Sequence, residues 1–274
     1  GEGEAVLVWY QGAIGEEDIY GQRIGVSGND ISTLWSSPQE GGIVISEAVG
    51  AQTSAKVTYM SEGLSIAVWM DSRNEPENGD IYMQIIDSEG SFPYLDSGGV
   101  AVCSANETQQ SPRVKADEYG AFIVWEDLRT PGSFGPQVDF YAQKVDLEGS
   151  IIWEANGIPI STADGTQNGI RLSTDKNGGA YCVWMDDRTG PGEAEEIDIF
   201  IQHLGNDGQI TFETNGMNIC SSEGMQFSAL VRDDGLGGAF IIWGDERTGN
   251  ISMRAQHLTI NGNLSYEDNG KEYF

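Results

Sequence analysis

The clearest pattern in the chain is a short apolar run that ends in tryptophan and returns five times. The five tryptophans are Trp9, Trp69, Trp125, Trp184 and Trp243, spaced by 60, 56, 59 and 59 residues. A fixed period of this length is typical of repeat proteins, in which each repeat buries its faces against its neighbours. The pattern divides the chain into five repeats at about residues 1–51, 52–108, 109–166, 167–225 and 226–274.

Apolar and polar residues also alternate in the segment that follows each tryptophan. In the second repeat Ile81 and Met83 alternate with Tyr82 and Gln84, the period of two that a half-buried strand requires. Turns rich in Gly, Asn and Asp come next and favour short hairpins. A third apolar segment follows, and then a fourth that begins with glutamine at Gln52, Gln109, Gln167 and Gln226.

These elements predict an all-β fold, a five-bladed β-propeller of four-stranded antiparallel blades forming a single domain over residues 1–274. The glutamine strand occurs only four times, so nineteen strands occupy a plan of twenty and one blade is a strand short. The blade then has an unpaired edge, which is a template for pairing with another strand. We expect either self-association through this edge, with a strand from a neighbouring subunit or from outside these residues, or a blade that simply has three strands.

Four of the five tryptophans continue into a W-x-D-x-R motif. Its members are Asp71 with Arg73, Asp127 with Arg129, Asp186 with Arg188, and Asp245 with Arg247. The spacing predicts that each aspartate pairs with its arginine. We interpret these pairs and the five tryptophans as structural, because a catalytic site repeated four times is implausible.

The order Q-x-x-P-x-V, GGAxxVWxDxR and DIYxQxxDxxG covers nearly the whole chain. It resembles the Trp-centred tandem-repeat propellers of large secreted bacterial surface proteins, which implies an extracellular or cell-surface location. The strand order is also distantly similar to sialidase-type (BNR-repeat) propellers. Their S-x-D-x-G-x-T-W box is absent, so none of their catalytic residues is carried over.

The composition of the chain disfavours several classes of binding partner. Forty-three acidic and fourteen basic residues give a net charge of −29, which disfavours nucleic acid and anionic membranes. No apolar run of about 18 residues is present, so we expect no membrane insertion. An extracellular glycan or a surface protein is the expected partner.

Candidate catalytic and metal-binding residues are few. His203 and His257 occupy the same strand position of different repeats, and one histidine per strand builds no metal site. No catalytic motif such as GxSxG or HExxH occurs, so we assign no catalytic residue and no metal site. The acidic turns at Asp175–Asn177 and Asp233–Asp234 are Ca²⁺ candidates, although hairpin turns explain them more simply. No other cofactor is expected.

A basic register provides the one candidate binding site. Lys56, Arg113 and Arg171 lie at one position of the glutamine strand, where the fourth copy has Leu230. By analogy with sialidase-type propellers this strand is innermost. The three cations either neutralise nearby carboxylates or form an anion-binding mouth for a uronate, sulfate or carboxylate group.

From these observations we expect a non-catalytic extracellular propeller that acts as a binding, adhesion or surface-assembly module. Two alternatives stay open: a glycan-active propeller enzyme, of glycosidase or lyase type, and a purely structural subunit of an extracellular fibre or layer. The longest inserts, at 130–138 and 189–197, predict that the face carrying these loops is the recognition face.

Overall fold

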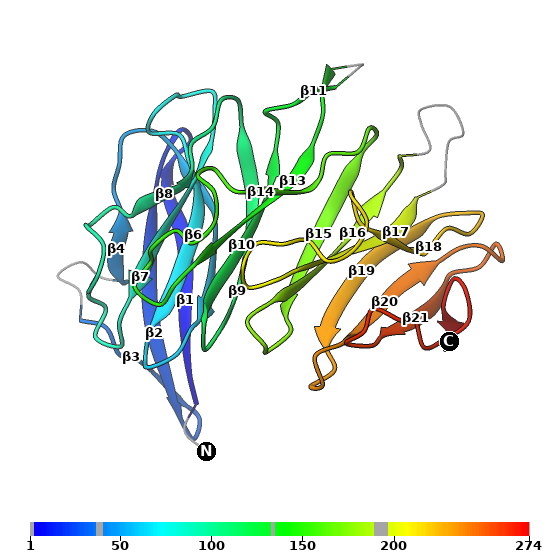
Figure 1. Cartoon of the computed structure of the whole chain (residues 1–274). Coiled ribbons are helices and arrows are strands. Elements are labelled where there is room, and N and C mark those ends of the chain that lie inside the picture. Colours follow the sequence, from blue (N-terminus) through cyan, green and yellow to red (C-terminus); the bar gives the residue numbers. More distant parts are fainter. Residues whose placement is uncertain (1–2, 37–40, 133–134, 189–196, 274) are drawn as a thin grey trace. The chain divides into compact units, whose positions relative to one another are not determined.

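The computed structural model describes residues 3–36, 41–132, 135–188 and 197–273. Its regular structure is entirely β, arranged in five antiparallel sheets and one short hairpin (Figure 1). The described residues contain no helix, and hence none that could span a membrane. The structure confirms a five-bladed β-propeller in which one blade lacks a strand.

The strands fall into five blades as follows. Blade 1 contains β1 (Gly3–Ala13), β2 (Glu16–Ser27), β3 (Asp30–Thr33) and β4 (Ile43–Ser46). Blade 2 contains β5 (Gln52–Tyr59), β6 (Ser65–Asp71), β7 (Asp80–Ile86) and β8 (Val100–Cys103). Blade 3 contains β9 (Gln109–Asp117), β10 (Gly120–Asp127), β13 (Asp139–Val145) and β14 (Ile158–Ser161). Blade 4 contains β15 (Gln167–Thr174), β16 (Ala180–Asp186), β17 (Asp198–Leu204) and β18 (Met217–Cys220). Blade 5 contains β19 (Gln226–Asp233), β20 (Ala239–Asp245), β21 (Ser252–Leu258) and β22 (Lys271–Glu272).

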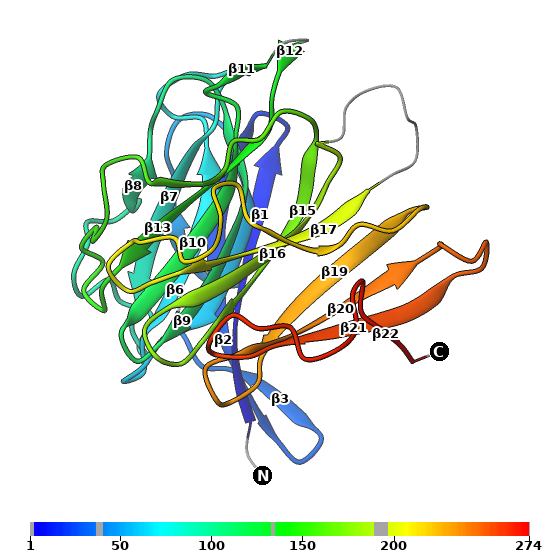
Figure 2. The same ribbon diagram turned by 45° about the vertical axis from the view of Figure 1, so that its right-hand side comes forward.

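In blades 2 to 5 the strands lie side by side in chain order, as Figure 2 shows for β19 to β22. The glutamine strand therefore forms one edge of each of these four blades, and within its blade it pairs only with the strand that carries the tryptophan. We call β5, β9, β15 and β19 the inner strands, because β5 lies next to β9 and β15 next to β19 as the innermost strands of adjacent blades do. We call β1, β6, β10, β16 and β20 the Trp strands.

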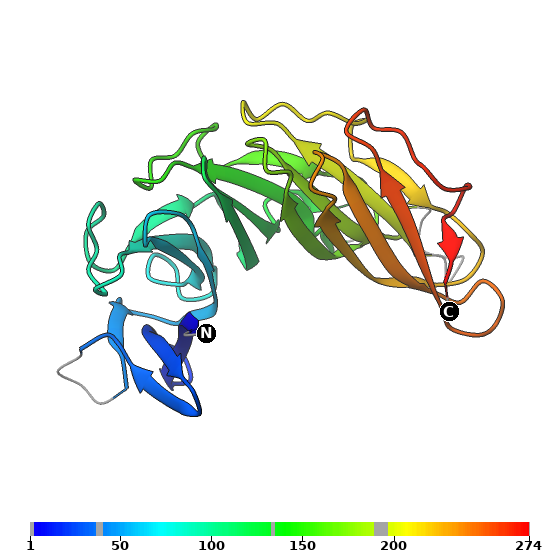
Figure 3. The same cartoon turned by 90° about the horizontal axis from the view of Figure 1, so that it is seen from below.

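The chain divides into two compact units, residues 1–125 with 143–157 and residues 126–142 with 158–274. The division passes through blade 3. In the first unit Trp69, Ile19 and Ile45 belong to a core shared by blades 1 and 2. In the second, residues such as Val183 and Ile241 form a core shared by blades 4 and 5, whose strands are yellow-green to red in Figure 3.

Four of the five repeat tryptophans are at most 1% exposed, and Trp9 is half-buried. The Trp184 ring covers Gly216, which has a φ of +89°. A Cβ atom there would collide with the ring, and the same holds for Gly99 under Trp69. A glycine before the outer strand, β8 or β18, is therefore required both by the left-handed backbone and by the tryptophan ring that covers it.

Each W-x-D-x-R motif forms a closed network. In blade 4 the Trp184 Nε1 donates to Asp186 Oδ2 over 2.8 Å, and the Arg188 Nε and Nη2 bind both carboxylate oxygens over 3.0 and 2.5 Å. The Arg188 guanidinium lies 3.7 Å from the centre of the Phe200 ring and donates to the Asn215 carbonyl over 2.8 Å. The same bidentate ion pair joins Asp71 to Arg73, Asp127 to Arg129 and Asp245 to Arg247. These donors satisfy both oxygens of a carboxylate that is buried away from water.

Asparagine side chains link neighbouring blades. Asn156, Asn215 and Asn269 each have a φ of 62–67° and each precede the glycine described above. Their Oδ1 atoms accept hydrogen bonds of 2.9–3.0 Å from the N–H groups of Ser104, Thr162 and Ser221, which directly follow the outer strands β8, β14 and β18 of the preceding blades.

Blade 1 departs from this plan. Gln11 replaces the aspartate of the motif, and β1 and β2 form a long hairpin that turns at Ile14 and Gly15. The outer strand is divided into β3 and β4, which both pair with β2. Within the described residues no strand pairs with the second edge of β1, so the missing strand is the inner one.

Candidate functional site

Every inner strand carries a β-bulge at the same position. The third residue of each strand has a left-handed backbone, with φ between 54° and 69°; these residues are Ser54, Ser111, Gly169 and Ser228. The pairing register with the Trp strand shifts across this point in β5, β15 and β19. Three of the four are serine, which rarely adopts this conformation. Strained residues of this kind cluster at functional sites, so the bulges indicate that the inner strands are candidates for the functional site.

The basic register lies two residues beyond each bulge. The Lys56 Nζ donates to the carbonyls of Ser54 and Ala55 over 3.2 and 3.1 Å. The Arg171 Nη1 donates to the carbonyls of Gly169 and Ile170 over 3.2 and 3.0 Å. Among the described residues no carboxylate pairs with Lys56 or Arg171.

Lys56 and Arg113 lie close to each other on the adjacent inner strands β5 and β9. Burial lowers the pKa of Lys56, and the nearby Arg113 guanidinium lowers it further. The Arg113 Nη1 donates to the Pro112 carbonyl over 3.1 Å. Both side chains are half-buried, so they stay within reach of a ligand. Arg171 belongs to the second compact unit.

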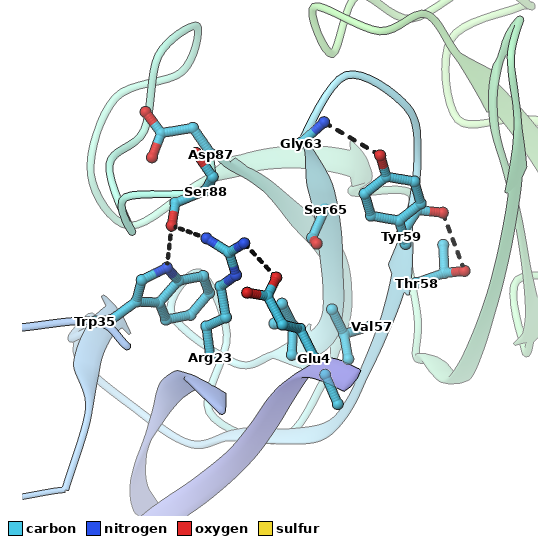
Figure 4. A pocket seen from close by; sticks show the side chains of 12 residues that line it. Glu4, Arg23, Trp35, Val57, Thr58, Tyr59, Gly63, Ser65, Asp87 and Ser88 are labelled. Atoms are coloured by element: carbon cyan, nitrogen blue, oxygen red, sulfur yellow. Dashed lines mark hydrogen bonds and ion pairs between the residues drawn. The ribbon is translucent and has the colours of Figure 1, made fainter. Parts of the chain in front are cut away.

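A pocket of about 290 Å³ lies in the first compact unit between β1 and the end of β5 (Figure 4). Its lining includes Glu4, Arg23, Trp35, Tyr59 and Ser88. Arg23 forms an ion pair with Glu4 and donates to the Ser88 carbonyl over 2.7 Å, and the Trp35 indole donates to the same carbonyl over 2.9 Å. The repeat pattern does not predict this pocket, because Trp35 lies outside the repeated tryptophan position.

The pocket presents one carboxylate rather than a pair. Asp87 also lines it, but in Figure 4 its carboxylate points away from Glu4 and Arg23. Its Oδ1 accepts hydrogen bonds from the N–H groups of Glu89 and Ser91, so it holds the turn after β7. Glycoside hydrolysis generally uses two carboxyl groups that flank the bond. The pocket does not supply that arrangement.

The two histidines each pair with an aspartate from a hairpin turn. The His203 Nε2 lies 2.8 Å from Asp175 Oδ2, and its Nδ1 lies 2.9 Å from Thr211 Oγ1. In blade 5, His257 makes the same contacts with Asp234 and Ser265, at 2.8 and 2.9 Å. Sequence reasoning missed these pairs, although Asp175 and Asp234 recur wherever the histidine does.

The proposed Ca²⁺ turns use their carboxylates within the protein. Asp175 Oδ1 accepts hydrogen bonds from the N–H groups of Asn177 and Gly179, while its Oδ2 contacts His203. Burial alone would raise the pKa of Asp175, but these hydrogen bonds outweigh it and lower the pKa. No group of three or more potential ligands gathers at a metal-binding distance in the part of the chain that is described.

The three cysteines, Cys103, Cys182 and Cys220, are buried and form no disulfide. Burial raises the pKa of the Cys182 thiol and raises that of Cys220 to about 11, so neither is a reactive thiolate at neutral pH.

The two inserts are described only in part. A short hairpin, β11 (Pro131–Gly132) with β12 (Gly135–Pro136), occupies the insert at 130–138. Residues 189–196 of the other insert lie outside the described residues, and the recognition face predicted there stays a prediction.

No protein-family model matches the sequence, and no curated protein is similar to it in sequence. An α-L-arabinanase from Penicillium chrysogenum, solved in complex with arabinobiose, matches with a TM-score of 0.51 and 10% identity over 97% of this chain and 83% of that chain. An α-L-arabinofuranosidase from Fusarium graminearum matches with a TM-score of 0.48 and 8% identity, over 92% and 74% of the two chains. An endo-1,5-α-L-arabinanase from Thermotoga petrophila has a TM-score of 0.44 and 11% identity, over 97% and 74%.

At this level of identity the similarity to the Penicillium structure establishes the shared fold alone. The comparisons nevertheless correct the functional expectation drawn from the sequence. The structures that the fold resembles are glycan-active enzymes, whereas we had interpreted the chain as a non-catalytic binding, adhesion or surface-assembly module. That interpretation was wrong, because the repeat pattern reports the scaffold and carries no information on catalysis.

Proposed function

We propose that the chain is a glycan-active enzyme whose substrate carries carboxylate groups, that Arg113 binds one of these carboxylates, and that Lys56 lies beside it as a general base. The observation that carries the proposal is the proximity of these two cations at one register of adjacent inner strands. The Arg113 guanidinium provides the charge and the hydrogen-bond donors that a carboxylate requires. The arabinobiose complex of the Penicillium arabinanase supports a sugar as the substrate.

The charge of the protein strengthens the assignment. In a chain with a net charge of −29, two neighbouring cations form a local attractive site for an anion within a repulsive field. Lys56 is held by backbone carbonyls, so its charge is not cancelled by a carboxylate among the described residues.

The residues present favour elimination over hydrolysis. The only carboxylates on the described inner strands are Asp117 and Asp233, at the last positions of β9 and β19. The cationic register therefore lacks the carboxyl pair that hydrolysis uses. A lysine whose pKa is lowered can instead serve as a general base.

In this reaction Lys56, as the general base, takes the proton from the carbon next to the carboxylate. The bond from the neighbouring carbon to the glycosidic oxygen breaks, a carbon–carbon double bond forms, and the departing oxygen takes a proton from water. Arg113 stabilises the negative charge that develops on the carboxylate. A polymeric substrate of this kind also supports a location outside the cell, which secretion assays on the source organism would test.

The experiment is a screen of the full chain against polyuronates and against neutral arabinan, with two readouts. Elimination yields an unsaturated uronate with ultraviolet absorbance, whereas hydrolysis yields reducing ends alone. We expect absorbance with a polyuronate, a loss of at least about 100-fold in Lys56→Met, and a raised KM in Arg113→Met. Lys271→Met, on the outer strand β22, is the control and should retain full activity.

Reducing ends without absorbance, unaffected by Lys56→Met, would place hydrolysis at another site and refute the assignment of Lys56. No product from any glycan would refute the enzymatic proposal itself.

A further inference from the structure

The inner edge of β1 is open along its length. β1 pairs with β2 from Gly3, opposite Val26, to Ala13, opposite Glu16. In the other four blades the second edge of the Trp strand pairs with an inner strand, but in blade 1 no described strand takes that place. The result is a row of backbone N–H and C=O groups without a strand partner, which is the usual template for strand addition.

An apolar side chain on β1 is exposed where its equivalents are buried. Leu7 lies two residues before the tryptophan, and its side chain is 47% exposed. The residues at the same position of the other Trp strands are all 0% exposed; they are Ala67, Ile123, Cys182 and Ile241. Covering Leu7 would recover an apolar contact that the other blades already have.

Open space accompanies the edge. The pocket in Figure 4 is lined by Glu4, Ala5 and Val6 on β1, and by the end of β5 at 57–59. In blade 2 the segment equivalent to 4–6 pairs with the second half of an inner strand. The pocket therefore borders the stretch of β1 where the second half of an inner strand is missing.

We propose that β1 accepts an extended peptide strand with the sequence pattern of the inner strands, which completes blade 1. The register follows from blade 2, where Val57 of the inner strand lies opposite Ala67. The equivalent of Ala67 is Leu7. The sixth residue of every inner strand is apolar, namely Val57, Val114, Leu172 and Val231. An incoming strand with this pattern thus places an apolar residue opposite Leu7, in an antiparallel ladder that runs past Trp9.

The donor is a segment outside residues 1–274. Each of the four inner strands in this chain already pairs with the Trp strand of its own blade. A folded second copy would therefore have to break a blade to supply one, so the occupant is not another folded copy of these residues.

The test uses a labelled peptide with the sequence of residues 109–117, QQSPRVKAD, which is the inner strand β9. We expect saturable binding to the full chain and slower hydrogen exchange at alternate amides between Ala5 and Gln11. Leu7→Lys should weaken binding at least about tenfold, since it removes one buried apolar contact. Ile14→Lys adds the same charge at a 99% exposed turn residue and should leave binding unchanged.

Two peptide controls require no change to the protein. A scrambled peptide of the same composition has the same charge and should not bind, and the peptide with Val114→Lys should bind at least about tenfold more weakly. Equal binding of the native and scrambled peptides would show a charge effect and overturn the proposal. So would unchanged exchange of the β1 amides at saturating peptide. Protection of β1 without peptide that grows with protein concentration would show that a second copy occupies the edge, and would also overturn it.

Discussion

The Asp175 carboxylate accepts hydrogen bonds from the backbone of its own turn and lies 2.8 Å from Nε2 of His203, which is 28 residues further along the chain. The contact joins the turn between β15 and β16 to the strand β17. Burial by itself would raise the pKa of Asp175, but its hydrogen bonds favour the charged form and hold the pKa below the ordinary value of 3.8.

This shift predicts how Asp175 contributes to stability as the pH changes. A carboxylate whose pKa is depressed in the folded protein stabilises it above the unfolded pKa, and this contribution is lost as the pH falls through the folded pKa. Asp175→Asn should therefore lower the free energy of unfolding by about 1.5–3 kcal/mol at neutral pH and by much less at about pH 3. Urea denaturation at the two pH values measures this, with Asp207→Asn at an exposed turn as the control. An equal loss at both pH values would contradict the role of the charge.

The buried carboxylate of the W-x-D-x-R motif is the second target. Asp186→Ala leaves the donors of Trp184 and Arg188 without their acceptor, so it should cost about 3–5 kcal/mol. The adjacent Asp187 accepts one hydrogen bond, from the Thr166 N–H over 2.8 Å, and Asp187→Ala should cost about 1 kcal/mol. Chemical denaturation compares the two variants. Similar losses would mean that the network adds nothing beyond one hydrogen bond.

The repeat tryptophans should contribute different amounts to the free energy of unfolding. Trp184 is fully buried, and replacing it with alanine should cost about 3–5 kcal/mol. Trp9 is half-buried and lacks the aspartate partner, so Trp9→Ala should cost about 1–2 kcal/mol. Thermal unfolding of both variants tests this. A larger loss for Trp9 would show that blade 1 is covered in solution.

The inner-strand bulge can be tested at Ser111, whose φ is 54°. Ser111→Gly should change the free energy of unfolding by less than about 0.5 kcal/mol, because glycine occupies the same place at Gly169 and suits the left-handed backbone. Ser111→Val should cost about 1–3 kcal/mol, since a β-branched residue is strained there. If valine were tolerated as well as glycine, the bulge would not be present in solution.

Much of the fold could be predicted from the sequence, because the strands are specified by the local alternation of apolar and polar residues. The apolar run before each tryptophan and the period-two segment at Ile81–Gln84 specify strands without reference to the rest of the chain. The missing inner strand also followed from counting glutamine strands. The bulges could not be foreseen, because serine carries no local signal for a left-handed backbone, and only Gly169 hints at one.

Less of the candidate functional site could be predicted from the sequence. The shared register of Lys56 and Arg113 was visible, but their proximity depends on how adjacent blades pack. The His203–Asp175 pair left a trace in the repeats: in blade 2 the histidine position holds Ile85 and the turn holds Met60, both buried. The two positions change together from polar to apolar. Comparing repeats for such paired changes would have revealed the contact.

In the asparagine hydrogen bonds, the asparagine always belongs to the later blade and the turn that it holds belongs to the preceding blade. Asn215 of blade 4 holds the turn that follows the last strand of blade 3, at Thr162, and Asn269 of blade 5 does the same for Ser221 of blade 4. During synthesis, which proceeds from the N-terminus, blades 3 and 4 therefore leave the ribosome before the asparagine that secures the final turn of each exists. Blade formation should trail translation by one repeat, and a nascent chain arrested within blade 4 should expose the turn at Thr162 to proteases although every residue of blade 3 has been made.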